Sequence, residues 1–204
     1  MHPLLDFCQG ITFDPSHTVV LALDCQTGVI SVYAKPQGDF ITRVSNVLNA
    51  ARGAGMAVIH VQVGFRPGLP EVSDRNKLIG AIKASKPHQE FFQGSSGKIH
   101  PVLGPKPDDV VIVKHRVSAF AGTDLNMILR AREIHTIVMF GIATSGVVLS
   151  TLLEASDSDY RLVVIEDCCA DLDMELHSAL IRRLFPARAD VMSAEDFVRL
   201  ENPS

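Results

Sequence analysis

Short apolar runs punctuate the chain, and each is continuous rather than alternating. Six such runs, rich in Val and Ile, cover residues 18–24, 57–63, 109–114, 136–141, 161–166 and 189–192. Continuous runs of this length are typical of strands that are buried on both faces of a sheet. The segments between several of these runs carry apolar residues at helical spacing. This alternation predicts an α/β fold in which a parallel sheet lies between two layers of helices.

The helical patterns have recognisable apolar positions and ends. Apolar residues at helical spacing are Ile41, Val44, Val47, Leu48 and Ala51 in one segment, Leu125, Ile128 and Leu129 in another, and Leu176, Leu180, Ile181 and Leu184 in a third. The glycines of GAG at 53–55 end the first of these helices, Pro186 stops the third, and Ser193 caps a last one.

The connection over residues 64–108 is the exception to short loops. It is rich in Gly, Pro, Ser and charged residues, and it is too long for a plain connection. The segment SDRNKLIGAIKAS within it predicts a helix. In doubly wound folds such an insertion often covers the ligand crevice at the carboxyl ends of the strands. A disordered surface excursion is the alternative.

Length, composition and charge narrow the class of protein. The 204 residues, 47% of them hydrophobic, fit one globular domain over residues 1–204 with a full-sized core. The net charge of −4 and the scattered Lys and Arg offer no basic surface for nucleic acid or acidic lipid, which favours small-molecule or protein partners. The chain begins without a signal-peptide pattern, and no apolar run approaches the roughly 18 residues of a membrane span. We therefore expect a cytoplasmic protein.

Cysteine and histidine spacing gives no sign of a metal or redox centre. The four cysteines, Cys8, Cys25, Cys168 and Cys169, form no C-x-x-C pair, so we expect reduced thiols. The eight histidines are dispersed and include no H-E-x-x-H motif. The sequence therefore predicts neither a metal site nor a cofactor.

The stretch TIVMFGIATSGVVLSTLL over 136–153 is the first candidate site. Its β-branched run ends at Gly141, and a second apolar pattern begins six residues later, which predicts a buried strand, a tight turn and a helix start. Such a turn aims backbone N–H groups and a helix dipole at one point, where an anion or oxyanion can bind. The alternative is an ordinary turn of a βαβ unit.

Two charged residues end the first and the third of the apolar runs. Asp24 follows VVLAL and Lys114 follows VVIV, so a parallel sheet would deliver both to the edge that also carries the 141–147 turn. A carboxylate and an ammonium in a semi-buried crevice hold each other charged, and either can exchange a proton with a substrate. The alternatives are a turn-capping Asp and a Lys that reaches into solvent.

Four motifs together resemble the isochorismatase-like hydrolases, a family that includes nicotinamidases, N-carbamoylsarcosine amidohydrolases and isochorismatases. They are LALDCQTG, VKHRVSAFAGTDL, FGIATSGVV and VVIEDCCAD, and the resemblance spans residues 17–200. It implies a Rossmann-like three-layer α/β/α sandwich with a six-stranded parallel sheet, assembled as a homodimer or larger homo-oligomer. It also implies that Asp24 and Lys114 are catalytic and that a cis peptide lies at Ile142–Ala143.

The sequence departs from the family pattern at the nucleophile. The family cysteine falls six positions after the turn glycine, where this chain has Val147. In the amidase branch that thiolate attacks the substrate carbonyl, which valine cannot do. Thr144 and Ser145 lack the surroundings of a nucleophile elbow. The nicotinamidase metal ligands are also missing, because His60 lies within a predicted strand.

Two functions remain open. The resemblance to isochorismatases, in which Asp protonates a vinyl ether and water completes the reaction, favours a hydrolase of a small molecule. Asp24 would be the acid, Lys114 its charge partner, and backbone N–H groups at Ala143 and Val147 an oxyanion site. Residues expected to contact the substrate are Gln26, Ser118, Phe120, Ile142 and Ala143. The alternative is a catalytically inactive member that binds small molecules or acts as an oligomeric interaction protein. An open crevice over Asp24, lined by Phe120 and the insertion, would favour the enzyme.

Overall fold

The fold is built on one parallel sheet, seen in a computed structural model that describes residues 11–35 and 37–201. Its six strands lie in the order β3-β2-β1-β4-β5-β6. They are β1 (Thr18–Leu23), β2 (Ala57–Val63), β3 (Val110–Lys114), β4 (Thr136–Ile142), β5 (Arg161–Ala170) and β6 (Asp190–Met192). Each strand coincides with one of the apolar runs, so the predicted six-stranded α/β fold is confirmed.

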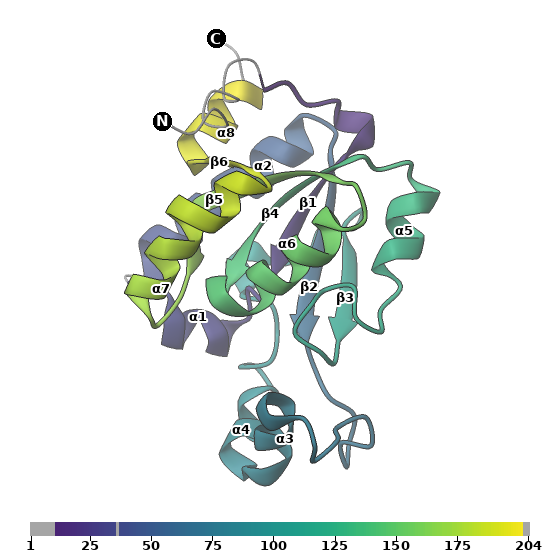
Figure 1. The fold of residues 1–204 in the computed structure, drawn as a ribbon, viewed down its shortest axis with the longest axis vertical. Helices are drawn as coiled ribbons and strands as arrows, with labels where there is room; N and C mark the ends of the chain where they lie inside the picture. Colours follow the sequence, from purple (N-terminus) through teal and green to yellow (C-terminus); the bar gives the residue numbers. More distant parts are fainter. Residues whose placement is uncertain (1–10, 36, 202–204) are drawn as a thin grey trace.

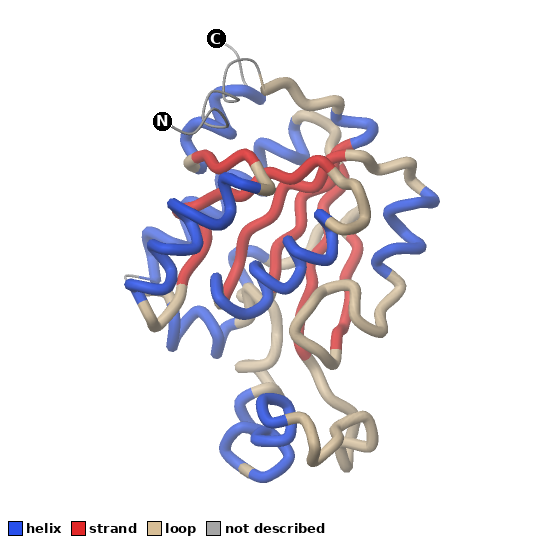
Figure 2. Tube along the Cα trace, in the orientation of Figure 1, coloured by secondary structure: helices blue, strands red, loops and turns tan. Residues whose placement is uncertain are grey.

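Helices cover both faces of this sheet, as Figures 1 and 2 show. They are α1 (Thr27–Tyr33), α2 (Gln37–Gly53), α3 (Lys77–Ala84), α4 (Lys86–Phe91), α5 (Leu125–Ala131), α6 (Leu149–Ser156), α7 (Met174–Ala179) and α8 (Ala194–Glu201). Helices α2 and α8 pack on each other and on the face behind the strands in Figure 1, and α6 crosses the front. Among the described residues, no helix is long and apolar enough to cross a membrane.

The centre of the sheet lies between β1 and β4, where the strand order reverses. Every residue of β1 is buried, because helices cover both of its faces. Gly141 allows the carboxyl ends of the two strands to approach: its φ is 149°, and a Cβ there would lie 2.1 Å from the Leu23 carbonyl oxygen. Ligands of doubly wound sheets bind at the carboxyl ends of the strands beside such a reversal.

The carboxyl end of one strand differs clearly from the sequence prediction. Strand β5 extends to Ala170, so Cys168 and Cys169 lie within the strand rather than after it. The pairing of β4 with β5 shifts register between Met139 and Gly141, and it resumes at Cys169. The strand therefore continues past the polar Glu166 and Asp167, where the apolar run ends.

The helix ends follow the predicted signals with one addition. The helix predicted over 176–184 consists of α7 and a wider π-helical turn at Leu180–Leu184, and Pro186 follows in a 3-10 turn. Ser193 precedes α8 and its Oγ accepts a hydrogen bond from the Asp196 N–H at 3.1 Å. The predicted cap is therefore confirmed.

The insertion over 64–108 is a folded lobe beyond the carboxyl ends of β2 and β3 (Figure 1). It contains the predicted helix, α3, and a second one, α4. Its last part returns to the main body: Thr27 N–H donates to the Lys98 carbonyl and Gly28 N–H to the Ser96 carbonyl, both at 2.9 Å. These bonds dock the lobe on the start of α1.

Candidate active site

Asp24 lies directly after β1, at the sheet edge where the insertion docks. Its φ of 52° is in the left-handed region, which Asp and Asn tolerate better than most residues. Its N–H donates to the Val61 carbonyl at 2.8 Å, which fixes the backbone against β2. The side chain is only 9% exposed. A strained and anchored backbone thus presents one carboxyl group at the strand end.

Lys114 ends β3 and meets Asp24 across the end of β2. Its Nζ lies 2.8 Å from Asp24 Oδ2 and donates a second hydrogen bond to the Arg116 carbonyl at 3.1 Å. The lysine side chain is 3% exposed, so this is a buried ion pair. Asp24 Oδ1 is buried and has no hydrogen-bond partner among the described residues. One carboxyl oxygen is therefore held by the protein and the other is left for a ligand.

The protonation of Asp24 is set by two opposing effects. Burial disfavours the carboxylate and raises the pKa of Asp24, and the charge and hydrogen bond of Lys114 only partly offset this. The raised pKa means that Asp24 holds a proton more readily than an exposed aspartate does. A carboxyl group with a raised pKa beside a cavity is suited to exchange a proton with a substrate.

A pocket of about 440 Å³ opens over this pair, within the size range of small-molecule sites. The sheet, its following loops and α1 supply Asp24, Val29, Val32, Tyr33, Val63, Lys114, Arg116, Val117, Ile142, Ala143 and Val147. The insertion supplies Leu78, Ile79, Ile82, His88, Phe91 and Phe92. The insertion therefore covers the crevice at the strand ends, as its position in the sequence predicted, and most of the lining is apolar.

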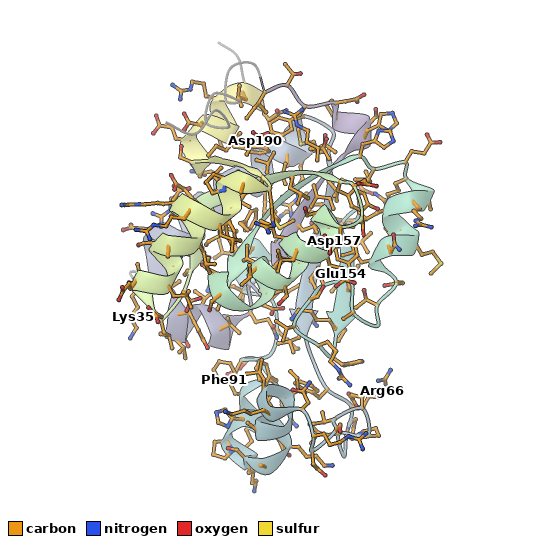
Figure 3. All side chains as sticks on the ribbon, in the orientation of Figure 1. Lys35, Arg66, Phe91, Glu154, Asp157 and Asp190 are labelled. Atoms are coloured by element: carbon orange, nitrogen blue, oxygen red, sulfur yellow. The ribbon has the colours of Figure 1, made fainter. Side chains whose placement is uncertain are left out.

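Close packing holds the insertion on α1. Figure 3 shows Phe91 on the part of the lobe nearest the sheet. A Cβ at Gly28 would lie 3.1 Å from Phe91 Cε2 and 3.2 Å from Ser96 Cβ, tighter than ordinary contacts. A larger residue at Gly28 would therefore need the Phe91 ring to shift by a few tenths of an ångström. The roof of the pocket therefore has a defined position on the main body.

The turn after β4 forms the floor of the pocket. The Ile142–Ala143 peptide is cis, at the position that the family resemblance implied. A π-helical turn over Thr144–Val148 follows, and the Gly146 and Val148 N–H groups donate to the Ala143 carbonyl at 3.1 and 3.3 Å. Val147 is buried and lines the pocket beside Ile142 and Ala143. The structure thus brings Val147 together with Asp24 and Lys114.

The hydroxyl groups of this turn point to other partners. The Ser145 N–H and Oγ both donate to Asp171 Oδ2, each at 2.7 Å. Thr144 Oγ1 lies 2.8 Å from Nδ1 of His177. Neither Thr144 nor Ser145 is among the described lining residues of the pocket. Asp171 and His177 therefore hold the turn through hydrogen bonds to Ser145 and Thr144. Both contacts join residues about thirty positions apart in the sequence, and no local pattern predicted them.

Three residues expected to contact the substrate lie outside the pocket lining. Gln26 Nε2 donates to the Val63 and Gly97 carbonyls at 3.0 and 2.6 Å, and Gln26 Oε1 accepts from the Val63 N–H at 3.0 Å. This side chain joins the end of β2 to the insertion.

The other two come from the loop after β3. Ser118 Oγ donates to Glu154, which lies on α6 and is labelled in Figure 3. Phe120 stacks on Tyr160, with ring centroids 6.4 Å apart. These side chains position the loop that follows Lys114, because each is engaged with another element rather than with the pocket.

The described cysteines are poorly suited to act as nucleophiles. Cys25, Cys168 and Cys169 are free and buried, and none of them lines the pocket. Burial raises the pKa of all three thiols, to about 12 for Cys169 and higher still for the other two. Thiols with raised pKa values are poor nucleophiles at neutral pH. Cys8 lies outside the described residues.

His60 lies inside β2, as the sequence indicated, with its Nε2 at 3.3 Å from Asp109 Oδ2. Within residues 11–35 and 37–201, no group of three or more His, Cys, Asp or Glu side chains is arranged to hold a metal ion.

Known proteins share this fold and sequence pattern. Residues 18–196 match the model of the isochorismatase domain. The uncharacterised isochorismatase family protein YecD of Escherichia coli O157:H7 is 30% identical over 184 residues, which cover 89% of this chain and 94% of the relative. The structure of an isochorismatase family protein from Burkholderia thailandensis is 29% identical, with a TM-score of 0.82 and coverage of 93% and 97% of the two chains.

A more distant structure shares the fold alone. N-carbamoylsarcosine amidase from Thermoplasma acidophilum is 24% identical, with a TM-score of 0.71 and coverage of 87% of this chain and 96% of its own. The domain match, the curated relative and the strand-end pair of Asp24 and Lys114 agree, and the chain therefore belongs to the isochorismatase family of hydrolases.

Proposed function

We propose that this protein hydrolyses a small molecule by acid catalysis from Asp24, without a cysteine nucleophile. The observation that carries the proposal is the arrangement of the Asp24 carboxyl group. Lys114 holds Oδ2, while the buried Oδ1 has no described partner and Asp24 lines an open pocket. The raised pKa of Asp24, caused by burial, supports a proton donor.

An enol ether is a substrate that this arrangement could hydrolyse. Asp24 would transfer its proton to the terminal carbon of the double bond, which leaves an oxocarbenium ion, and the Asp24 carboxylate beside Lys114 would stabilise that cation. Water would add to the cationic carbon. Asp24 would take one proton from the added water and give it to the alcohol oxygen as that C–O bond of the hemiketal breaks, and the remaining hydroxyl proton of the hemiketal would return to Asp24 as the ketone forms. The products are a ketone and an alcohol, and Asp24 ends protonated.

Val147 supports a mechanism without covalent catalysis. Its isopropyl group lines the pocket at the position of the family cysteine, and none of the described lining residues is a cysteine. The backbone N–H groups at Ala143 and Val147 would serve as an oxyanion site where negative charge develops.

Turnover of a panel of amides, ureas and enol ethers tests the proposal, with wild type compared with Asp24→Asn and Val147→Cys. Asn keeps the left-handed backbone tolerance of Asp24 and removes only the acid. We expect wild type to hydrolyse an enol ether and Asp24→Asn to lose that activity.

A protein that binds a ligand without turning it over is the second candidate, and Val147 favours it. In that case wild type would be inert throughout the panel, and Val147→Cys, which restores a thiol beside Asp24 and Lys114, would gain amidase activity. That result would replace the proposed hydrolase by a small-molecule-binding or oligomeric interaction protein.

A further inference from the structure

Arg116 brings a second positive charge to the pocket. It lies two residues after Lys114 and lines the same cavity, half-buried. Lys114 Nζ is already paired with Asp24 Oδ2 at 2.8 Å, so its charge is largely compensated within the protein. Among the residues that the structure describes, no carboxylate is paired with Arg116 in this way.

Backbone carbonyl groups hold the guanidinium in place. Arg116 Nη1 donates to the His115 carbonyl at 2.7 Å, and Nη2 donates to the Glu71 carbonyl at 2.8 Å. A guanidinium has five N–H donors, and these two bonds use neutral acceptors. The side chain is therefore oriented while its charge is kept, and donors remain for another partner.

The neighbouring carboxylate of Glu71 lies close to other side chains. The Glu71 carboxylate lies 3.5 Å from His115 Nδ1 and 3.9 Å from Arg66 Nη1. No carboxylate of the described residues lies within ion-pair distance of Arg116. With Asp24 and Lys114 compensating each other, the pocket therefore carries a net positive charge.

The remaining walls limit what kind of anion could bind. Phe91 and Phe92 meet nearly perpendicularly, with centroids 5.1 Å apart, and Leu78 and Ile82 join them on the roof. Apolar walls favour a ring or branched carbon body. A planar guanidinium fork matches a carboxylate, whereas a doubly charged phosphate would need more donors than this lining offers.

We propose that Arg116 anchors the carboxylate of a ligand whose apolar body lies between the insertion and α1. This inference rests on the proposed function, since it names the substrate class of the same pocket. A carboxylate on Arg116 would place the rest of the molecule beside the unpartnered Oδ1 of Asp24. Arg116 would then select the substrate, and Asp24 would act on it.

Binding of benzoate and benzamide tests the anchor without any need for turnover. The two probes have the same ring and differ in charge, and isothermal titration or ligand-observed NMR measures their affinities. We expect wild type to prefer benzoate by about tenfold or more, the range of a hydrogen-bonded charge. Binding of neither probe at millimolar concentration, or equal binding of both, overturns the inference.

Matched variants assign the preference to Arg116. Arg116→Gln should weaken benzoate about tenfold and leave benzamide unchanged. Arg66→Gln is the control, because Arg66 is 62% exposed at its side chain and does not line the pocket. It should keep the full preference. An unchanged preference in Arg116→Gln overturns the inference.

The hydrogen bonds of Arg116 to the His115 and Glu71 carbonyls also hold the loop, so Arg116→Gln could fail to fold for that reason alone. Should Arg116→Gln not fold, Arg116→Lys decides: it keeps the charge without the planar fork, and we expect a reduced but measurable preference. A preference undiminished in Arg116→Lys, or already absent from wild type, overturns the anchor.

The outcomes also separate this inference from the proposed function. Asp24→Asn should lose turnover and still prefer benzoate. A benzoate preference in a protein without turnover would leave the anchor intact and remove the hydrolase. Hydrolysis of neutral enol ethers as fast as carboxylated ones would keep the hydrolase and remove the anchor.

Discussion

Two buried carboxyl groups, one just after β1 and one just before β3, differ in how many partners hold them. Asp109, just before β3, accepts hydrogen bonds from Arg52 Nη2 at 2.6 Å and from the Lys106 N–H at 2.8 Å, and it also contacts His60. Asp24 is held by Lys114 through one oxygen only. Both side chains are less than a tenth exposed, at 4% and 9%.

Their pKa values move in opposite directions although both are buried. Burial acts to raise the pKa of Asp109, but the Arg52 and Lys106 hydrogen bonds outweigh it and hold that pKa below its usual value. Burial prevails at Asp24, whose pKa is raised. The balance between burial and hydrogen-bond partners therefore differs at the two carboxyl groups, and at Asp24 it favours the protonated form.

The largest expected difference between the two is in turnover. Asp24→Asn should lower hydrolysis of an active enol ether by about 10²–10⁴-fold, the usual contribution of a positioned acid. Asp109→Asn should change it little, because Asp109 does not line the pocket. Steady-state kinetics of both variants checks this. Comparable losses in the two would show that fold integrity, not proton donation, explains the effect.

Stability should rank the same substitutions in the reverse order. Asp109→Asn leaves Arg52 and His60 without their shared anion, and we expect the free energy of unfolding to fall by about 3 kcal/mol. Asp24→Asn puts an amide of the same shape in place of a carboxyl group that is readily protonated. We therefore expect the free energy of unfolding to fall by only about 1 kcal/mol. Urea denaturation measures both, and a larger loss for Asp24→Asn would contradict the assignment of roles.

Gln26 tests whether the insertion depends on its connection to β2. Gln26→Ala removes three buried hydrogen bonds to Val63 and Gly97, and we expect a loss of about 2 kcal/mol, felt most in the insertion. Hydrogen exchange over residues 64–108 should quicken while exchange in β1 and β4 stays slow. Uniform acceleration throughout the sheet would mean that Gln26 supports the core rather than the roof.

The dependence of stability on pH should differ in sign between the two carboxyl groups. The lowered pKa of Asp109 contributes stability above its unfolded value of about 3.9, and that contribution is lost as the pH falls through its folded pKa. The raised pKa of Asp24 contributes stability below about 3.9, which is lost as the pH rises through its folded pKa. The destabilisation by Asp109→Asn should therefore shrink at acidic pH, and that by Asp24→Asn should shrink at neutral pH.

Lys114→Met gives the smallest expected effect, and it tests the pairing of Lys114 with Asp24 directly. Because the charge of Lys114 lowers the pKa of Asp24, its removal should raise that pKa further. Carbon-13 NMR titration of the Asp24 carboxyl group follows this without a substrate. Lys83→Met, at a pair with Asp74 in the insertion, is the control and should leave the Asp24 titration unchanged. A lowered Asp24 pKa in Lys114→Met would contradict the pairing.

The sequence was sufficient for the sheet because the central strands are buried on both faces and the edge strand β3 is also a continuous apolar run, although its Val111 and Val113 are exposed. Continuous apolar runs located all six strands, and strand-end residues located Asp24, Lys114 and the turn before Val147. Strand β5 was cut short because Glu166 and Asp167 interrupt its apolar run.

Side-chain direction in loops was beyond local patterns. Gln26 and Ser118 follow strand ends, as pocket residues do, yet their partners are a β2 carbonyl and a side chain of α6. Arg116 received no role from the sequence, because its place in the pocket depends on the Glu71 carbonyl, which lies 45 residues earlier in the chain. Contacts of this range arise from tertiary packing, which spacing alone does not encode.

The division of the pocket between sheet and insertion has an evolutionary consequence. Asp24 and Lys114 lie at the ends of β1 and β3, whereas Leu78, Ile82, Phe91 and Phe92 come from one continuous lobe that packs near Gly28. Changes in residues 64–108 can reshape what enters without disturbing the strands that hold the acid. The lobe is thus a unit that can diversify among relatives, or be exchanged by an engineer, while Asp24 and Lys114 keep their positions at the strand ends.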